Sequence, residues 1–211
     1  EFRRVLFRSK KIELKKVTPS QVIKHPTWQM GKKISVDSAN LMNKVLELIE
    51  ASLIFKLPIN KFKMLIHPQS LIHAIVQFNN GLSSMLYHHN DMKIPIINSL
   101  YNNHVAIENV DKKFLSGKKL IFSDIDLKKY PSAKILKLNN ILNETGYILI
   151  NALNEFLVQR FLESKLNFTD IIHKLLIILN SKLIKNYLKK HKIRHINDIF
   201  KVYNYARSLL N

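Results

Sequence analysis

Residues 25–51 read HPTWQMGKKISVDSANLMNKVLELIEA, and this stretch combines an irregular segment with a strong helical pattern. Apolar side chains recur at helical spacing from Leu41 to Ile49, so we expect a helix from Asp37 to about Lys56. The positive end of its dipole would then lie near Asp37 and attract an anion.

Three polar side chains of different chemistry follow within this expected helix. Helical neighbours at i, i+3 and i+4 share a face, so Asn43 and Lys44 should lie beside Glu47. An amide, a compact cation and a carboxylate together suit a phosphate group and a divalent metal ion. Taken alone, Glu47 would be interpreted as a solvated helix carboxylate.

The segment before the helix has the composition of a binding loop. Pro26 and Gly31 bracket Trp28 and Met30, which predicts a flap that is mobile before a ligand binds. The alternative is that Trp28 belongs to the core.

The composition is that of a chain able to bury a core. The chain has 211 residues, 46% of them apolar, and no apolar run approaches the 18 residues of a membrane span. It has no Cys, which excludes disulfides and thiolate metal sites.

The net charge of +19 raises the alternative of a nucleic-acid binder. Against it, the Lys residues are dispersed and Arg is scarce, whereas a nucleic-acid face favours clustered Arg with aromatics.

Four blocks in order resemble one enzyme family: residues 25–51, then LIHPQSLIHAIVQF at 65–78, NDMKIPI at 90–96 and NALNEFLVQRFLESKLNFTDI at 151–171. They are similar to 1-deoxy-D-xylulose-5-phosphate reductoisomerase. The resemblance implies an α+β fold, in which a catalytic domain with helices and a small, mainly antiparallel sheet precedes a C-terminal domain resembling a four-helix bundle.

The resemblance also implies an activity and partners. Family members rearrange 1-deoxy-D-xylulose 5-phosphate and reduce it with NADPH to 2-C-methyl-D-erythritol 4-phosphate, a step in isoprenoid precursor biosynthesis. We expect Mg2+ or Mn2+, a phosphorylated sugar substrate and a homodimer formed through strands at 62–87. We expect neither nucleic acid nor membrane as a partner, and a bacterial cytoplasm or plastid stroma as the location.

Individual roles follow from positions that match the family. The expected catalytic residues are Glu47, His25 and Trp28. The matching residues are Glu47 as the metal ligand; His25, Ser38, Asn43, Lys44 and Glu47 for the substrate; Gly31 and Met92 for NADPH; and Met30 and His73 as pocket support.

One part of the family pattern has no counterpart. The four Gly residues, at 31, 81, 117 and 146, are too far apart for the phosphate turn of a nucleotide-binding domain. We therefore expect the chain to resemble only the back half of the enzyme, with an incomplete metal site and no activity alone. A non-catalytic, dimerising homologue is the main alternative.

The predicted domains are a non-matching start at 1–16, a catalytic domain at 17–105, a linker at 106–130 and a helical domain at 131–211. Three of six Arg residues fall within the first eight residues, so the start is compositionally foreign to the rest of the chain. We interpret it as a cloning or sequencing junction, with a basic targeting segment or a surface strand as the alternatives.

Turn residues and periodicity predict the secondary structure. A Lys-rich stretch at 182–192 is interpreted as a solvated face rather than a docking patch. The histidines His67, His73, His88 and His89 leave a zinc site as a minor alternative. The remaining expected elements are helices at 17–24, 91–101, 132–143, 146–165, 169–180 and 196–210, and strands at 62–66, 71–78 and 82–87.

Overall fold

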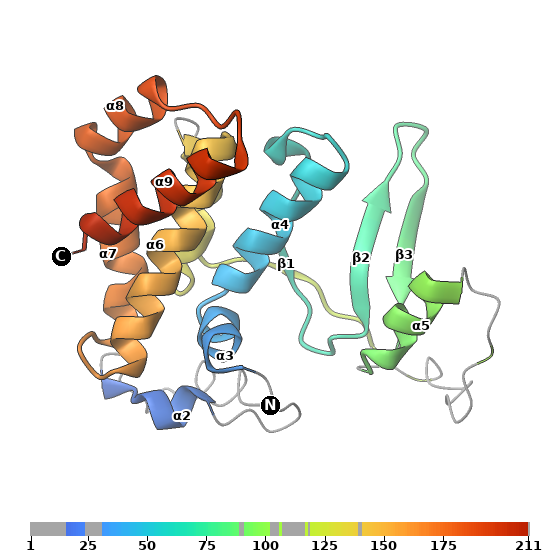
Figure 1. The fold of residues 1–211 in the computed structure, drawn as a ribbon. Coiled ribbons are helices and arrows are strands. Elements are labelled where there is room, and N and C mark those ends of the chain that lie inside the picture. The colour runs from blue at the N-terminus through green and yellow to red at the C-terminus, as the bar shows by residue number, and fades with distance from the viewer. Residues whose placement is uncertain are drawn as a thin grey trace. The chain divides into compact units, whose positions relative to one another are not determined.

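The structure, a computed structural model, describes residues 16–23, 31–88, 91–101, 106, 117, 119–138 and 141–210 (Figure 1). The chain divides into two compact units. Unit 1 consists of Glu1–Lys63 with Asp126–Asn211, and unit 2 consists of Met64–Ile125. Helices and small antiparallel sheets make up these units, which confirms the predicted α+β class. No helix in the described part is long and apolar enough to cross a membrane.

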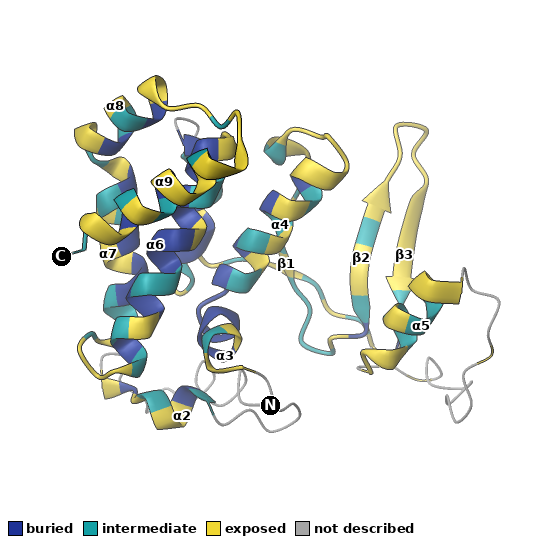
Figure 2. Cartoon of the chain, in the orientation of Figure 1, coloured by how far each residue is buried: buried dark blue, intermediate teal, exposed yellow. Residues whose placement is uncertain are grey.

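Unit 1 is built around α6, which contacts α3, α7 and α9. Its inner side chains, such as Leu149, Leu153 and Leu157, are fully buried, and burial of this kind drives the packing (Figure 2). The elements of unit 1 are α2 (Pro19–Ile23), α3 (Lys32–Ala39), α4 (Met42–Ile54), the 3-10 helices η2 (Ile59–Lys61) and η3 (Pro131–Lys137), α6 (Glu144–Leu162), α7 (Phe168–Asn180), α8 (Lys182–Lys190) and α9 (Ile196–Ser208).

The single helix predicted from Asp37 to about Lys56 is wrong, because two helices meet at a corner. α3 begins at Lys32, and the chain turns at Asn40 and Leu41 before α4 begins. Leu41 adopts the left-handed conformation with φ of 61°. The Asn40 side chain accepts a hydrogen bond from the Met42 N–H at 2.9 Å, which replaces a helical bond and starts α4.

One prediction for the C-terminal helices needs correction, and another gains detail. Residues 131–137 form a 3-10 helix where an α-helix was expected over 132–143. The Lys-rich stretch forms α8, whose Ile184 and Leu188 are buried while most of its Lys side chains are exposed. The predicted solvated face is thus the outer side of an amphipathic helix.

The start of α9 is fixed by one carboxylate. Asp198 accepts backbone N–H bonds from Arg194 and His195, both at 3.1 Å, and pairs with Lys201 at 3.0 Å. The Lys201 hydrogen bond, followed by the two backbone bonds, lowers the pKa of Asp198 to about 2. This carboxylate therefore stays charged at neutral pH and caps the helix.

Unit 2 contains two antiparallel strand pairs. β2 (Ile72–Gln77) and β3 (Ser83–Tyr87) form the predicted hairpin, in which Ile75 lies opposite Met85. β1 (Leu65–Ile66) pairs with β4 (Ser123–Asp124), which lies inside the segment predicted to be a linker. The helix α5 (Lys93–Tyr101) follows the hairpin, as predicted.

The compact units divide the chain differently from the predicted domains. The helices α3 and α4 belong with the C-terminal helices because α3 contacts α6 and α4 contacts η3. The residues around the predicted boundary at 105 lie outside the described ranges, so that boundary remains a prediction.

Candidate functional site

The three polar side chains of α4 come together as the helical spacing predicts. The amide nitrogen of Asn43 donates to Oε1 of Glu47 at 2.5 Å, and Nζ of Lys44 lies 2.7 Å from Oε2. The Lys44 and Glu47 side chains are 46% and 45% exposed. An ion pair this open adds little to stability, and both side chains remain accessible to a ligand.

Both carboxylate oxygens of Glu47 already accept a hydrogen bond from the protein. Each oxygen keeps a further lone pair for a metal ion, which would share this carboxylate or compete for it with the two donors. Carboxylate oxygens are the ligands that Mg2+ and Mn2+ prefer, while the ammonium of Lys44 suits a phosphate. The arrangement is therefore chemically able to bind both ligands.

Gly31 and Ser38 lie at opposite ends of α3. Gly31 precedes the first turn and is exposed, and no described residue lies within 4 Å of the place where a Cβ would be. Ser38 is buried in the last turn, where the helix dipole is negative. The prediction that a helix dipole attracts an anion near Asp37 is therefore wrong. The positive end of a helix dipole lies instead at the N-terminus of α4, beside Asn43 and Lys44.

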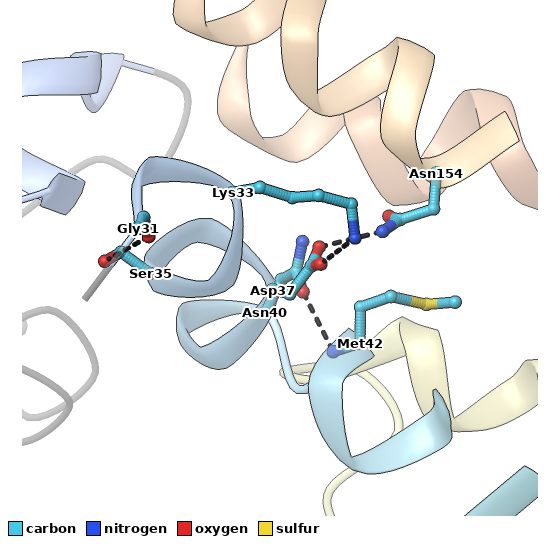
Figure 3. Close-up of polar contacts among 7 residues, drawn as sticks. All are labelled: Gly31, Lys33, Ser35, Asp37, Asn40, Met42 and Asn154. Atoms are coloured by element: carbon cyan, nitrogen blue, oxygen red, sulfur yellow. Dashed lines mark hydrogen bonds and ion pairs between the residues drawn. The ribbon is translucent and has the colours of Figure 1, made fainter. Parts of the chain in front are cut away.

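Sequence reasoning missed an ion pair beside Ser38 in which the carboxylate is buried and the Lys side chain is partly exposed. Asp37 is 2% exposed, and its carboxylate lies 2.8 Å from Nζ of Lys33. Asn154 of α6 donates its side-chain N–H to the same carboxylate at 2.8 Å (Figure 3). The spacing of Lys33 and Asp37 signals the ion pair, whereas no local pattern reveals the contact with Asn154.

The remaining described site candidates lie in unit 2. His73 stacks on the buried His88, with ring centroids 3.7 Å apart, and its Nδ1 lies 3.1 Å from the Leu71 carbonyl. A carbonyl only accepts, so Nδ1 of His73 carries the proton. Met92 is 55% exposed just before α5. Among the described residues no three His, Asp or Glu side chains are placed to hold a metal. His89, another of the zinc candidates, lies outside the described residues.

Three predicted site residues, His25, Trp28 and Met30, lie in the segment 24–30, outside the described residues. Their roles in a flap remain predictions.

Two family models match the chain. The first, the 1-deoxy-D-xylulose 5-phosphate reductoisomerase C-terminal domain, matches residues 5–55, and the second, the DXP reductoisomerase C-terminal domain, matches residues 88–209. The first match starts at residue 5, whereas no resemblance was expected before residue 17. Both models describe the C-terminal part of a reductoisomerase. The chain belongs to the 1-deoxy-D-xylulose 5-phosphate reductoisomerase family.

Curated relatives agree with this assignment. The enzyme of that name from Pelagibacter ubique is 42% identical over 199 residues, and the one from Wolbachia pipientis is 36% identical over 201 residues. These alignments cover 92% and 94% of this chain but 50% of each relative. The chain thus spans about half the length of the relatives it matches.

Solved structures show the same fold. A DOX-P reductoisomerase in complex with NADPH, fosmidomycin and magnesium is 30% identical, with a TM-score of 0.83 over 93% of this chain and 49% of that one. The Zymomonas mobilis enzyme in complex with NADPH is also 30% identical, with a TM-score of 0.74 over 92% of this chain and 49% of that one.

Proposed function

We propose that this chain supplies the substrate-phosphate site and one metal ligand of a 1-deoxy-D-xylulose 5-phosphate reductoisomerase. In the complete enzyme the sugar phosphate would be rearranged and then reduced by NADPH. The observation that carries the proposal is the cluster of Asn43, Lys44 and Glu47, which lies open to ligands on α4 of a chain of this family.

Each side chain of the cluster has a distinct proposed role. Lys44 and Asn43 would hold the substrate phosphate, together with Ser38. Glu47 would bind Mg2+ or Mn2+, which acts as a Lewis acid on substrate oxygens when bound. Glu47 suits this ion, but one carboxylate does not complete a site, so further acidic ligands must come from outside the described residues.

The other expected contacts stay part of the proposal. Gly31 and Met92 would contact NADPH, His73 would support the pocket, and the flap residues would close over the substrate and exclude water. The reaction needs a nucleotide-binding domain to hold NADPH, so we expect the 211-residue chain alone not to turn over substrate.

The first test joins this chain to the NADPH-binding half of the Pelagibacter ubique relative and measures substrate-dependent NADPH oxidation with Mg2+. Lys44→Ala should weaken substrate binding by about 2 to 4 kcal/mol, because the phosphate is left with one cation fewer. The variant Lys189→Ala, which removes an exposed Lys from α8, should have no effect. An unchanged Michaelis constant for Lys44→Ala would exclude the phosphate role.

We further propose that the β2–β3 hairpin contributes to a homodimer interface. Large apolar side chains on it are exposed, among them Val76 (50%), Leu82 (66%) and Leu86 (57%). Monomeric proteins rarely leave so apolar a strand pair in water, and a second copy would cover it.

Sedimentation of the 24.7 kDa chain tests the dimer. We expect twice the chain mass for the unaltered protein and the single-chain mass for Val76→Lys, since a buried charge opposes association. Ile177→Lys, a matched change at a 57% exposed site on α7, should leave the dimer intact. A monomer at every concentration of the unaltered chain would overturn the proposal.

A further inference from the structure

The corner between α3 and α4 is held by buried contacts from distant parts of the chain. Ser132 of η3 donates its hydroxyl to the Asn40 carbonyl at 2.6 Å, and Asn154 of α6 donates to Asp37 at 2.8 Å. Ser132 and Asn154 are 0% exposed. Figure 3 shows the Asn154 side chain extending from α6 to Asp37, which also pairs with Lys33.

The corner has a backbone conformation that its sequence does not favour. Leu41 is a buried, non-glycine residue with φ of 61°, a region that costs free energy for any residue with a Cβ. Such residues persist where their surroundings fix them, and they are frequent at functional sites. The hydrogen bonds from Ser132 and Asn154 are two contacts that hold this corner from elsewhere in the chain.

The contact of Asn154 is not explained well by stability alone. Its Oδ1 is buried without a hydrogen-bond partner among the described residues, and so is Nδ2 of Asn40. Burying an unpaired amide atom is unfavourable, and this cost offsets part of what the bond to the Asp37 carboxylate contributes. What the amide of Asn154 provides is a directed N–H bond to Asp37.

The Asp37 carboxylate also has an electrostatic consequence for the site. It immediately precedes Ser38, one of the proposed phosphate-binding residues, and an uncompensated buried anion there would repel a phosphate. Lys33 and the N–H of Asn154 compensate this charge.

We propose that Ser132 and Asn154 are positioning residues of the phosphate site. They preset the corner so that Ser38, at the end of α3, and the polar cluster of α4 bind one phosphate group. The helices that follow residue 130 thereby contribute to binding although they hold none of the proposed ligand contacts. This inference rests on the proposed function.

The test uses the 211-residue chain with inorganic phosphate as the probe. Backbone amide chemical shifts of residues 38–47 are followed during the titration, well below the unfolding temperature. Asn154→Ala and Ser132→Ala should each raise the dissociation constant at least fivefold. Thr145→Val is the matched control, since it removes another buried hydroxyl that donates to a backbone carbonyl, that of His191 at 2.9 Å, away from the corner. It should lower the melting temperature while leaving phosphate affinity within twofold.

A charge exchange gives a second, independent measurement. Asn154→Asp places two carboxylates face to face and should weaken phosphate binding most. Adding Asp37→Asn gives the pair one amide donor and one carboxylate again, with their positions exchanged. The double variant should therefore regain a phosphate affinity within about threefold of that of the unaltered chain.

The outcomes separate the two proposals. Phosphate binding that is equal in the unaltered chain and in Ser132→Ala and Asn154→Ala overturns the positioning role alone. Failure of the exchange to restore affinity also overturns it. If the unaltered chain shows no shifts with phosphate, the proposed phosphate site is itself wrong, and the positioning role falls with it.

Discussion

Replacing Glu47 by Gln is expected to abolish most of the activity of the complete enzyme while leaving the fold unchanged. Gln keeps the size and helix propensity of Glu but removes the charge that holds a divalent ion. Losing a direct ligand should cost more than about a hundredfold, which is the upper end for losing an outer-shell partner of a metal ligand. The ion pair with Lys44 is open to solvent, so stability without metal should change by less than about 1 kcal/mol.

The measurement is NADPH oxidation by the joined enzyme as a function of Mg2+ or Mn2+, with thermal unfolding recorded without metal. Added metal should recover part of the activity if weakened metal binding is the cause. Glu50→Gln is the control, because Glu50 is an exposed carboxylate on the same helix. Unaltered activity of Glu47→Gln at low metal concentration would make Glu47 an ordinary surface residue.

The second large effect concerns Gly146, in the first turn of α6. Its N–H donates to the Asn143 side chain at 2.9 Å, and a Cβ added at Gly146 would overlap the backbone carbonyl of Ile141. A backbone group packed this closely cannot rotate away as a side chain can. Gly146→Ala should therefore lower the free energy of unfolding by about 3 kcal/mol or more.

Urea denaturation of the 211-residue chain measures this loss directly. Gly31→Ala is the control, because no atom of the described residues lies within 4 Å of a Cβ built there. We expect it to change stability by less than about 1 kcal/mol. Equal midpoints for Gly146→Ala and the unaltered chain would mean that the start of α6 can move away from Ile141.

Local patterns predicted much of the fold and the polar cluster. Asn43, Lys44 and Glu47 meet because helical geometry fixes neighbours at i, i+3 and i+4 whatever surrounds the helix. The hairpin was predictable from the turn at Asn79-Asn80-Gly81 between two apolar runs. The family resemblance supplied the roles of these residues, which their spacing alone does not give.

The errors arose where distant contacts override local preference. The apolar pattern continues across Asn40 and Leu41, so it gives no sign of a corner that Ser132 holds from η3. The strand β4 has two residues and is defined by its pairing with β1, a contact that periodicity cannot reveal. The bond between Asp37 and Asn154 joins residues far apart in sequence for the same reason.

The hydrogen bonds within the α4 cluster have a thermodynamic consequence for its two proposed ligands. Lys44 and Glu47 pair when nothing is bound, and a phosphate on Lys44 and a metal ion on Glu47 each compete with this one ion pair. Whichever ligand binds first therefore bears the cost of this competition and releases the other side chain for the second. Metal and phosphate should then bind with positive cooperativity, and the coupling must be reciprocal: metal tightens phosphate by the same factor by which phosphate tightens metal.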